Sequence, residues 1–110
     1  MKGTNLGELE EMILLVVASL FDNAYGVVIK EEVESKCQRS ITISTVHNVL
    51  QRLAEKDYLE SRYSDPTPER GGKRKLLFRV TKSGQEALEN AKSIREQIWQ
   101  SIPKVAFDRS

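Results

Sequence analysis

The segment TISTVHNVLQRL, residues 42–53, constrains the fold of this chain more than any other. Four apolar side chains recur in it at positions i, i+3, i+4 and i+7: Val46, Val49, Leu50 and Leu53. This spacing predicts an amphipathic helix with one buried stripe and with Thr42 as its N-cap. The opposite side of the helix is polar and carries no acid before Glu55.

That polar side is rich in groups that both donate and accept hydrogen bonds, which is how side chains read base edges in a DNA major groove. We expect six residues to face bases there: Thr42, Ser44, Thr45, His47, Asn48 and Gln51. Arg52, at the edge of this face, should meet a phosphate. The alternative for the same pattern is an ordinary solvated helix face.

A long β-hairpin is predicted after this helix. Residues 75–80 (KLLFRV) alternate with the period of a half-buried strand, the inner set being Leu76, Phe78 and Val80. Residues 59–63 match more weakly, across a loop that contains two prolines and a Gly-Gly pair. A helix-turn-helix followed by a basic hairpin is the plan of a winged-helix DNA-binding domain, in which the hairpin, or wing, contacts phosphates.

The net charge of +1 conceals a gradient along the chain. Residues 1–37 carry three bases against seven acids, whereas residues 62–82 carry seven bases against two acids. Clustered positive charge supplies the salt-sensitive, sequence-independent part of DNA affinity. We therefore expect phosphate contacts from the wing, from Arg70, Lys73, Arg74 and Lys75. A basic loop kept exposed for solubility is the alternative.

Two further helices are predicted before residue 42. The first, over about residues 6–20, is apolar almost all round in its middle and should be buried on more than one side. The second runs from about Val27 to Cys37. Cys37 lies on the inner stripe of this helix, which favours a small core residue over a redox-sensing thiol.

The last helix is predicted over residues 83–102, with Thr81 and Ser83 as alternative N-caps and Pro103 at its end. It carries an apolar seam: Leu88, Ala91, Ile94, Ile98, Trp99 and Ile102. The three earlier helices and the hairpin already form a closed small domain without this last helix. We therefore expect the same helix of a second subunit to cover the seam in a homodimer. The alternative is a helix that folds back as core of its own monomer. Trp99 either fills the seam or stacks on a flat ligand.

Length and composition exclude several classes of protein. A chain of 110 residues with 39% apolar and 30% charged residues forms one domain without room for a deep enzyme cleft. His47 has no catalytic partner recognisable by spacing, so we expect no enzyme, no cofactor and no metal. A single cysteine excludes an internal disulfide and a cysteine-rich zinc site. The longest apolar run is too short to span a bilayer, so we expect a cytoplasmic protein without membrane contact.

Five short pieces occur in a fixed order: Leu6-Gly-Glu-Leu-Glu10, Tyr25-Gly26, residues 42–53, Gly71-Gly-Lys-Arg-Lys75 and Val80-Thr-Lys-Ser-Gly84. Together they make residues 5–100 resemble the PadR family of transcriptional regulators. The resemblance implies a homodimeric winged helix-turn-helix repressor that binds a double-stranded DNA operator. The single short C-terminal helix is similar to that of the family's smaller subgroup, whose members often respond to small aromatic or lipophilic compounds. In that case Trp99 would be a ligand contact.

Several positions depart from the family's pattern. His47 stands where the recognition helix usually has a tyrosine, and Val27 where the second helix usually has an aromatic residue. Asp57 replaces the glycine expected after the recognition helix, although Asp tolerates a left-handed backbone moderately well. Leu77 and Phe78 replace a pair of tyrosines on the wing. The operator sequence therefore does not follow from the family.

The sequence thus predicts a mainly α fold with a small β-hairpin. The winged helix-turn-helix should cover residues 1–82, the dimerisation helix 83–102, packed on the same domain, and a tail 103–110. The function favoured is a sequence-specific, homodimeric transcriptional repressor. The resemblance implies in addition that a small aromatic or lipophilic ligand could relieve the repression. The alternative is a winged helix that contacts another protein through its polar face, against which the basic wing and the lack of acids on that face argue.

Overall fold

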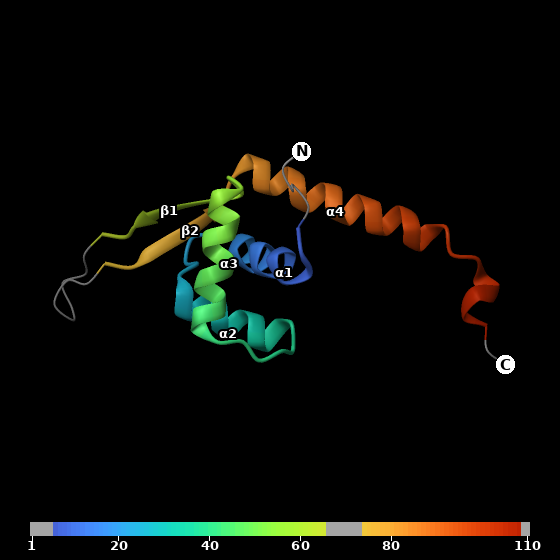
Figure 1. Ribbon diagram of the computed structural model, residues 1–110, viewed down its shortest axis with the longest axis horizontal. Helices are drawn as coiled ribbons and strands as arrows, with labels where there is room; N and C mark the ends of the chain where they lie inside the picture. The colour runs from blue at the N-terminus through green and yellow to red at the C-terminus, as the bar shows by residue number, and fades with distance from the viewer. Residues whose placement is uncertain (1–5, 66–73, 109–110) are drawn as a thin grey trace.

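The computed structural model describes residues 6–65 and 74–108, which form a helical head and two arms that project from it (Figure 1). In chain order they are α1 (Glu8–Ser19), α2 (Gly26–Lys36), α3 (Ile43–Glu55), β1 (Leu59–Tyr63), β2 (Leu76–Val80), α4 (Lys82–Gln100) and the 3-10 helix η2 (Lys104–Phe107). The β1–β2 hairpin extends from one side of the α1–α3 head and α4 extends from the other (Figure 1). The predicted fold class is confirmed: mainly α, with a small hairpin and a C-terminal helix.

The core lies where α1, α2 and α3 meet. The predicted stripe of α3 is at most 1% exposed: Val46, Val49, Leu50 and Leu53. The apolar middle of α1 is buried on more than one side, through Ile13, Leu14, Val16 and Val17, and α2 adds Ile29 and Val33. Removing a Val, Leu or Ile side chain from water contributes about 1.5–3 kcal/mol, so these contacts dominate the stability of the head.

Both ends of α3 follow from local chemistry. At the start, the Thr42 hydroxyl accepts a hydrogen bond from the Thr45 N–H at 3.1 Å, as the predicted cap requires. Beyond the other end, Asp57 adopts a left-handed backbone with φ of 65°. An aspartate thus occupies the conformation for which a glycine was expected, and the chain turns there into β1.

The hairpin is antiparallel, with Leu59 opposite Val80 and Tyr63 opposite Leu76. The expected alternation is wrong at one step, because Leu77 is 8% exposed whereas Leu76 is 37% exposed. The base of the hairpin is enclosed by the head, where the Phe78 N–H donates to the Ala24 carbonyl at 2.8 Å. Leu76 lies farther out along the wing, beyond that cover.

The half-buried and buried residues of α4, which pack on the head, all lie in the first part of the helix. Thr81, one of the two alternative caps, accepts the Gly84 N–H at 3.0 Å and is the N-cap. Gly84 is buried, and a Cβ there would collide with the Tyr58 carbonyl oxygen, so the helix begins in close contact with the head. From Lys92 to Gln100 every residue of α4 is exposed.

Helix α4 ends at Gln100, just before the predicted limit at residue 102, and Pro103 precedes η2. Because the hairpin and α4 project from opposite sides of the head (Figure 1), the molecule is elongated, with extents of 62 × 35 × 21 Å. None of the helices in the described part of the chain is long and apolar enough to cross a membrane.

Candidate nucleic-acid interface

The outer face of α3 is an exposed polar surface. Five of the side chains predicted to contact DNA lie exposed on it: Ser44, His47, Asn48, Gln51 and Arg52. Within residues 6–65 and 74–108, the side chains of Ser44, Asn48 and Gln51 have no hydrogen-bond partner, so their donors and acceptors are open to an external partner. The buried stripe on the other side of the helix holds this face outward.

The two threonines of the predicted base-reading set have local roles. The Thr42 hydroxyl donates to Thr45 Oγ1 at 3.0 Å while it accepts the Thr45 N–H. Thr42 is exposed, and Thr45 is half-buried beside it. Both side chains are therefore occupied in holding the first turn of α3.

The imidazole of His47 lies against the first residue of α2. A Cβ built on Gly26 would be 3.0 Å from His47 Cε1 and 3.3 Å from Nε2. Gly26 therefore leaves the space that the ring occupies. Sequence reasoning missed this contact, since nothing in the spacing of the two residues relates them.

The described part of the wing brings Lys75, one of the predicted phosphate contacts, to the same end of α2. The Lys75 ammonium donates to the Tyr25 hydroxyl at 3.1 Å and lies 4.3 Å from the centre of its ring. Tyr25 precedes Gly26 as the N-cap of α2, where free backbone N–H groups favour anions. Lys75 and His47 thus both adjoin the start of α2, and the surroundings suit a phosphate.

The remaining wing bases are not equivalent. Arg74 is exposed, whereas Arg70 and Lys73 lie outside the described residues. Arg62 and Arg79, which the charge count included, are both paired with Asp22, at 2.7 Å and 3.1 Å. The hydrogen bond from Arg79 is the main reason that the pKa of Asp22 is below its ordinary value. The positive charge of the wing is therefore partly compensated within the chain.

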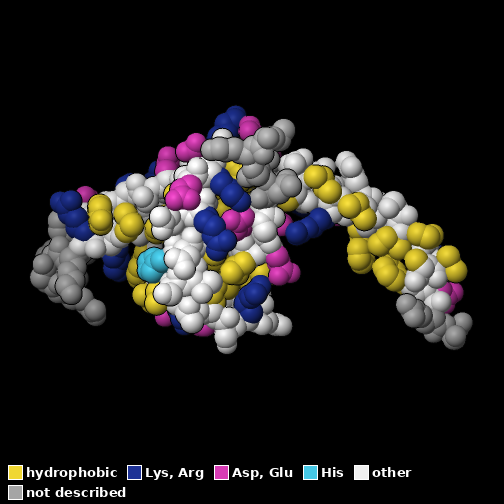
Figure 2. All heavy atoms as spheres, in the orientation of Figure 1, with side chains coloured by type: hydrophobic (Ala, Val, Ile, Leu, Met, Phe, Trp, Pro, Cys, Tyr) yellow, Lys and Arg dark blue, Asp and Glu magenta, His cyan; other side chains and the backbone are white. Residues whose placement is uncertain are grey.

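The seam of α4 divides into a covered and an uncovered part. Leu88, Ala91 and, beyond the helix, Ile102 are half-buried, whereas Ile94, Ile98 and Trp99 are 49%, 61% and 65% exposed. Phe107 of η2 lies near Trp99, with ring centres 6.0 Å apart. Apolar side chains gather over the far end of α4 and over η2 (Figure 2).

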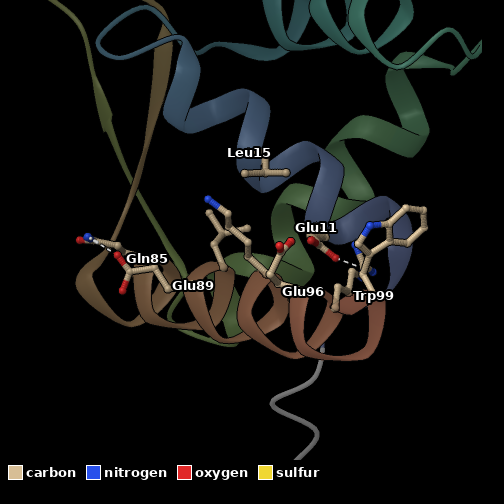
Figure 3. Close-up of a pocket in the computed structure, with 9 residues that line it drawn as sticks. Glu11, Leu15, Gln85, Glu89, Glu96 and Trp99 are labelled. Atoms are coloured by element: carbon tan, nitrogen blue, oxygen red, sulfur yellow. Dashed lines mark hydrogen bonds and ion pairs between the residues drawn. The ribbon is translucent and has the colours of Figure 1, made fainter. Parts of the chain in front are cut away.

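A groove of about 550 Å³ runs between α1 and α4, with Leu15, Leu88 and Trp99 among its lining residues (Figure 3). Leu15 is 50% exposed although it belongs to the apolar middle of α1. Glu11 lies at the end of the groove beside Trp99, and Arg95 pairs with it at 2.7 Å. The groove thus combines apolar and charged side chains from both helices.

No set of three or more His, Cys, Asp or Glu side chains gathers to hold a metal ion in the described ranges, residues 6–65 and 74–108. Cys37 is a half-buried free thiol that packs against the core.

Comparison with solved structures identifies the same architecture. The chain is similar to a PadR family transcription regulator of Clostridium difficile, with 25% identity, a TM-score of 0.68, and coverage of 86% of this chain and 93% of the other. A PadR-like transcriptional regulator of Bacillus cereus gives a TM-score of 0.73 at 16% identity, covering 92% and 93% of the two chains. The second likeness, at its low identity, bears on the fold alone.

Sequence comparison adds the family. An uncharacterized protein of Lysinibacillus sphaericus is 34% identical over 84 residues, which are 74% of this chain and 72% of the relative. The transcriptional regulator PadR-like family matches residues 13–90, a span that runs from α1 into α4. The resemblance drawn from five sequence pieces is confirmed, and the chain belongs to the PadR-like family of transcriptional regulators.

Proposed function

We propose that this regulator is a homodimeric, sequence-specific DNA-binding repressor whose α3 enters the major groove. The observation that carries the proposal is the outer face of α3, which is exposed, acid-free and rich in uncommitted hydrogen-bonding groups. Ser44, His47, Asn48 and Gln51 are the proposed base readers. Thr42 and Thr45 would support them by holding the first turn of the helix.

Phosphate contacts would flank that face on both sides. Arg52 lies on α3, and Arg74 and Lys75 lie on the described part of the wing. Arg70 and Lys73 join them on the sequence argument alone. These contacts would set affinity and its salt dependence, because phosphates are the same along every sequence.

The exposed seam of α4 supports the homodimer. Ile94, Ile98 and Trp99 are apolar side chains on the part of α4 in which every residue is exposed, and an identical helix can cover them. A dimer also gives two copies of α3, which meet successive major grooves if they lie about 34 Å apart. A dimer bound across a promoter would exclude polymerase, and we therefore propose repression.

The groove between α1 and α4 is the proposed effector site. Leu15 and Leu88 offer apolar walls and Trp99 offers a flat ring, which suits a small aromatic or lipophilic compound. A second α4 across the seam would close the open side of this groove. Ligand binding there would change how two heads are held relative to each other.

The direct test is a titration of the purified protein against DNA from its own upstream region, beside a scrambled duplex, at several salt concentrations. A salt-dependent preference for the native sequence of at least a hundredfold (~3 kcal/mol) is expected. Weak and equal binding to both duplexes would overturn the proposal. It would favour the alternative, in which the face of α3 contacts a protein, and a pull-down would follow.

Asn48→Ala tests base reading on α3. The substitution is expected to weaken operator binding by about 1–3 kcal/mol and to leave binding to the scrambled duplex nearly unchanged, because a carboxamide distinguishes bases through paired hydrogen bonds. Asn90→Ala, which removes an exposed carboxamide from α4, is the matched control and should bind as the wild type does. Equal losses on both duplexes would show that Asn48 does not read bases.

A further inference from the structure

The loop between α1 and α2, residues 21–25, joins both strands of the wing through one carboxylate. Asp22 accepts a hydrogen bond from Arg62 of β1 at 2.7 Å. It also accepts two from Arg79 of β2, from Nε at 3.2 Å and from Nη2 at 3.1 Å. The carboxylate is therefore shared between the two strands.

The same loop makes further contacts with β2 and with Lys75, the residue that precedes β2. The guanidinium of Arg79 lies over the ring of Phe21, 5.0 Å from its centre. The Ala24 carbonyl accepts the Phe78 N–H, and the Tyr25 hydroxyl accepts a hydrogen bond from Lys75. The loop thus runs beside the wing from its base towards its tip.

The wing needs such support because its described part is a sheet of two strands. An isolated two-stranded hairpin is marginally stable in water at best. Its base packs on the core through Leu59 and Phe78, but the opposed pair farther out, Tyr63 and Leu76, is 64% and 37% exposed. Core packing therefore cannot hold the outer part of the wing, and contacts with residues 21–25 remain to set its direction.

We propose that Asp22 is a positioning residue for DNA binding, which clamps β1 and β2 to the head so that Arg74 and Lys75 are presented to phosphates. Arg62 and Arg79 serve the clamp and are not DNA contacts. The inference rests on the proposed function, since it assumes that the wing meets DNA. It assigns a role to an acid that simple electrostatics would place among the residues unfavourable to DNA.

The charge of Asp22 and its clamping role predict opposite effects on DNA affinity, and this difference can be tested. Removing a negative charge near the DNA should strengthen binding if Asp22 acts only through its charge. Loosening the wing should weaken binding, because the wing must then be ordered when DNA binds. Asp22→Asn is expected to weaken binding about tenfold, to operator and scrambled duplex alike, as ordering a loosened segment would require.

The matched control is Glu31→Gln, which removes an exposed acid from α2, one for which the described residues supply no ion pair. It should bind DNA as the wild type does, or slightly more tightly. Hydrogen exchange measures the clamp without DNA: in the Asp22→Asn variant the hairpin amides should exchange faster, while those of α3 stay unchanged. This second readout separates a loosened wing from a destabilised head.

Unchanged or tighter DNA binding by Asp22→Asn, or unchanged protection of its hairpin, would overturn the clamp. Failure of the wild type to bind either duplex would overturn the proposed function instead, and hydrogen exchange would still show whether Asp22 holds the wing. Should Asp22→Asn not fold, Arg79→Lys keeps the charge and loses the paired hydrogen bonds. It should show a smaller loss of the same kind, and wild-type affinity for this variant would overturn the proposal.

Discussion

Helices α3 and α4 carry apolar side chains at the same helical spacing, yet one stripe is buried and the other is largely exposed. The stripe of α3 is at most 1% exposed, whereas Ile98 and Trp99 of α4 are more than half exposed. The difference lies in the surroundings, since the stripe of α3 is enclosed by α1, α2 and the hairpin, whereas every residue of α4 after Ala91 is exposed. Apolar periodicity thus predicts that a face will be covered, but not which chain covers it.

The largest effect is expected from Leu50→Ala, in the buried stripe. Leu50 is 1% exposed, and the substitution should lower the free energy of unfolding by about 3 kcal/mol through lost burial and a cavity. Urea denaturation in dilute protein measures it. Ile98→Ala, in the exposed stripe, should change the same quantity by less than about 0.5 kcal/mol. Equal losses would mean that the α4 seam is core of its own monomer.

Trp99→Ala tests whether a second copy of α4 covers the exposed stripe. If a second α4 covers the seam, this substitution should weaken dimerisation by about 2 kcal/mol, as removal of a central interface tryptophan does, and raise the dimer Kd about thirtyfold. Sedimentation equilibrium measures the Kd. Gln97→Ala, also an exposed residue of α4, is the control and should dimerise as the wild type does. Unchanged association of the Trp99 variant would place the dimer contact elsewhere.

The smallest effect is expected from the ion pair that joins α4 to α1 of the head. Arg95 pairs with Glu11, whose side chain is only 10% exposed, while that of Arg95 is 63% exposed. Arg95→Met keeps most of the aliphatic stem and removes the charge, so the head should lose about 1 kcal/mol because a mostly buried carboxylate has lost its cation.

Urea denaturation of Arg95→Met would be compared with that of Lys92→Met, which removes another cation that lines the same groove. Within the described residues Lys92 has no ion pair, so its loss should leave the stability of the head unchanged. Equal stability of the two variants would show that Glu11 does not need Arg95, and that α4 is joined to the head only through its first turns.

The helices and the hairpin could be predicted because their signals are local. The α3 stripe, its Thr42 cap and the strands near residues 59–63 and 76–80 each depend on neighbours a few positions apart. Thr81 and Ser83 were equally good caps on that basis. In the structure Thr81 is the cap, and its hydroxyl also donates a hydrogen bond to the Asp57 carbonyl at 2.6 Å. This contact joins residues 24 positions apart, so no local pattern could reveal it.

The sequence predicted which types of residue form the candidate site, but not how those residues contact one another. Sequence alone determined that α3 has an exposed polar face and that basic residues follow it, because side-chain periodicity and charge composition are properties of the chain itself. Only the tertiary structure decided that His47 lies on Gly26, that Arg95 pairs with Glu11, and that Asp22 takes up Arg62 and Arg79. Such pairs join residues far apart in the chain, and no local pattern marks them, since any acid and any base attract equally until folding selects which of them meet.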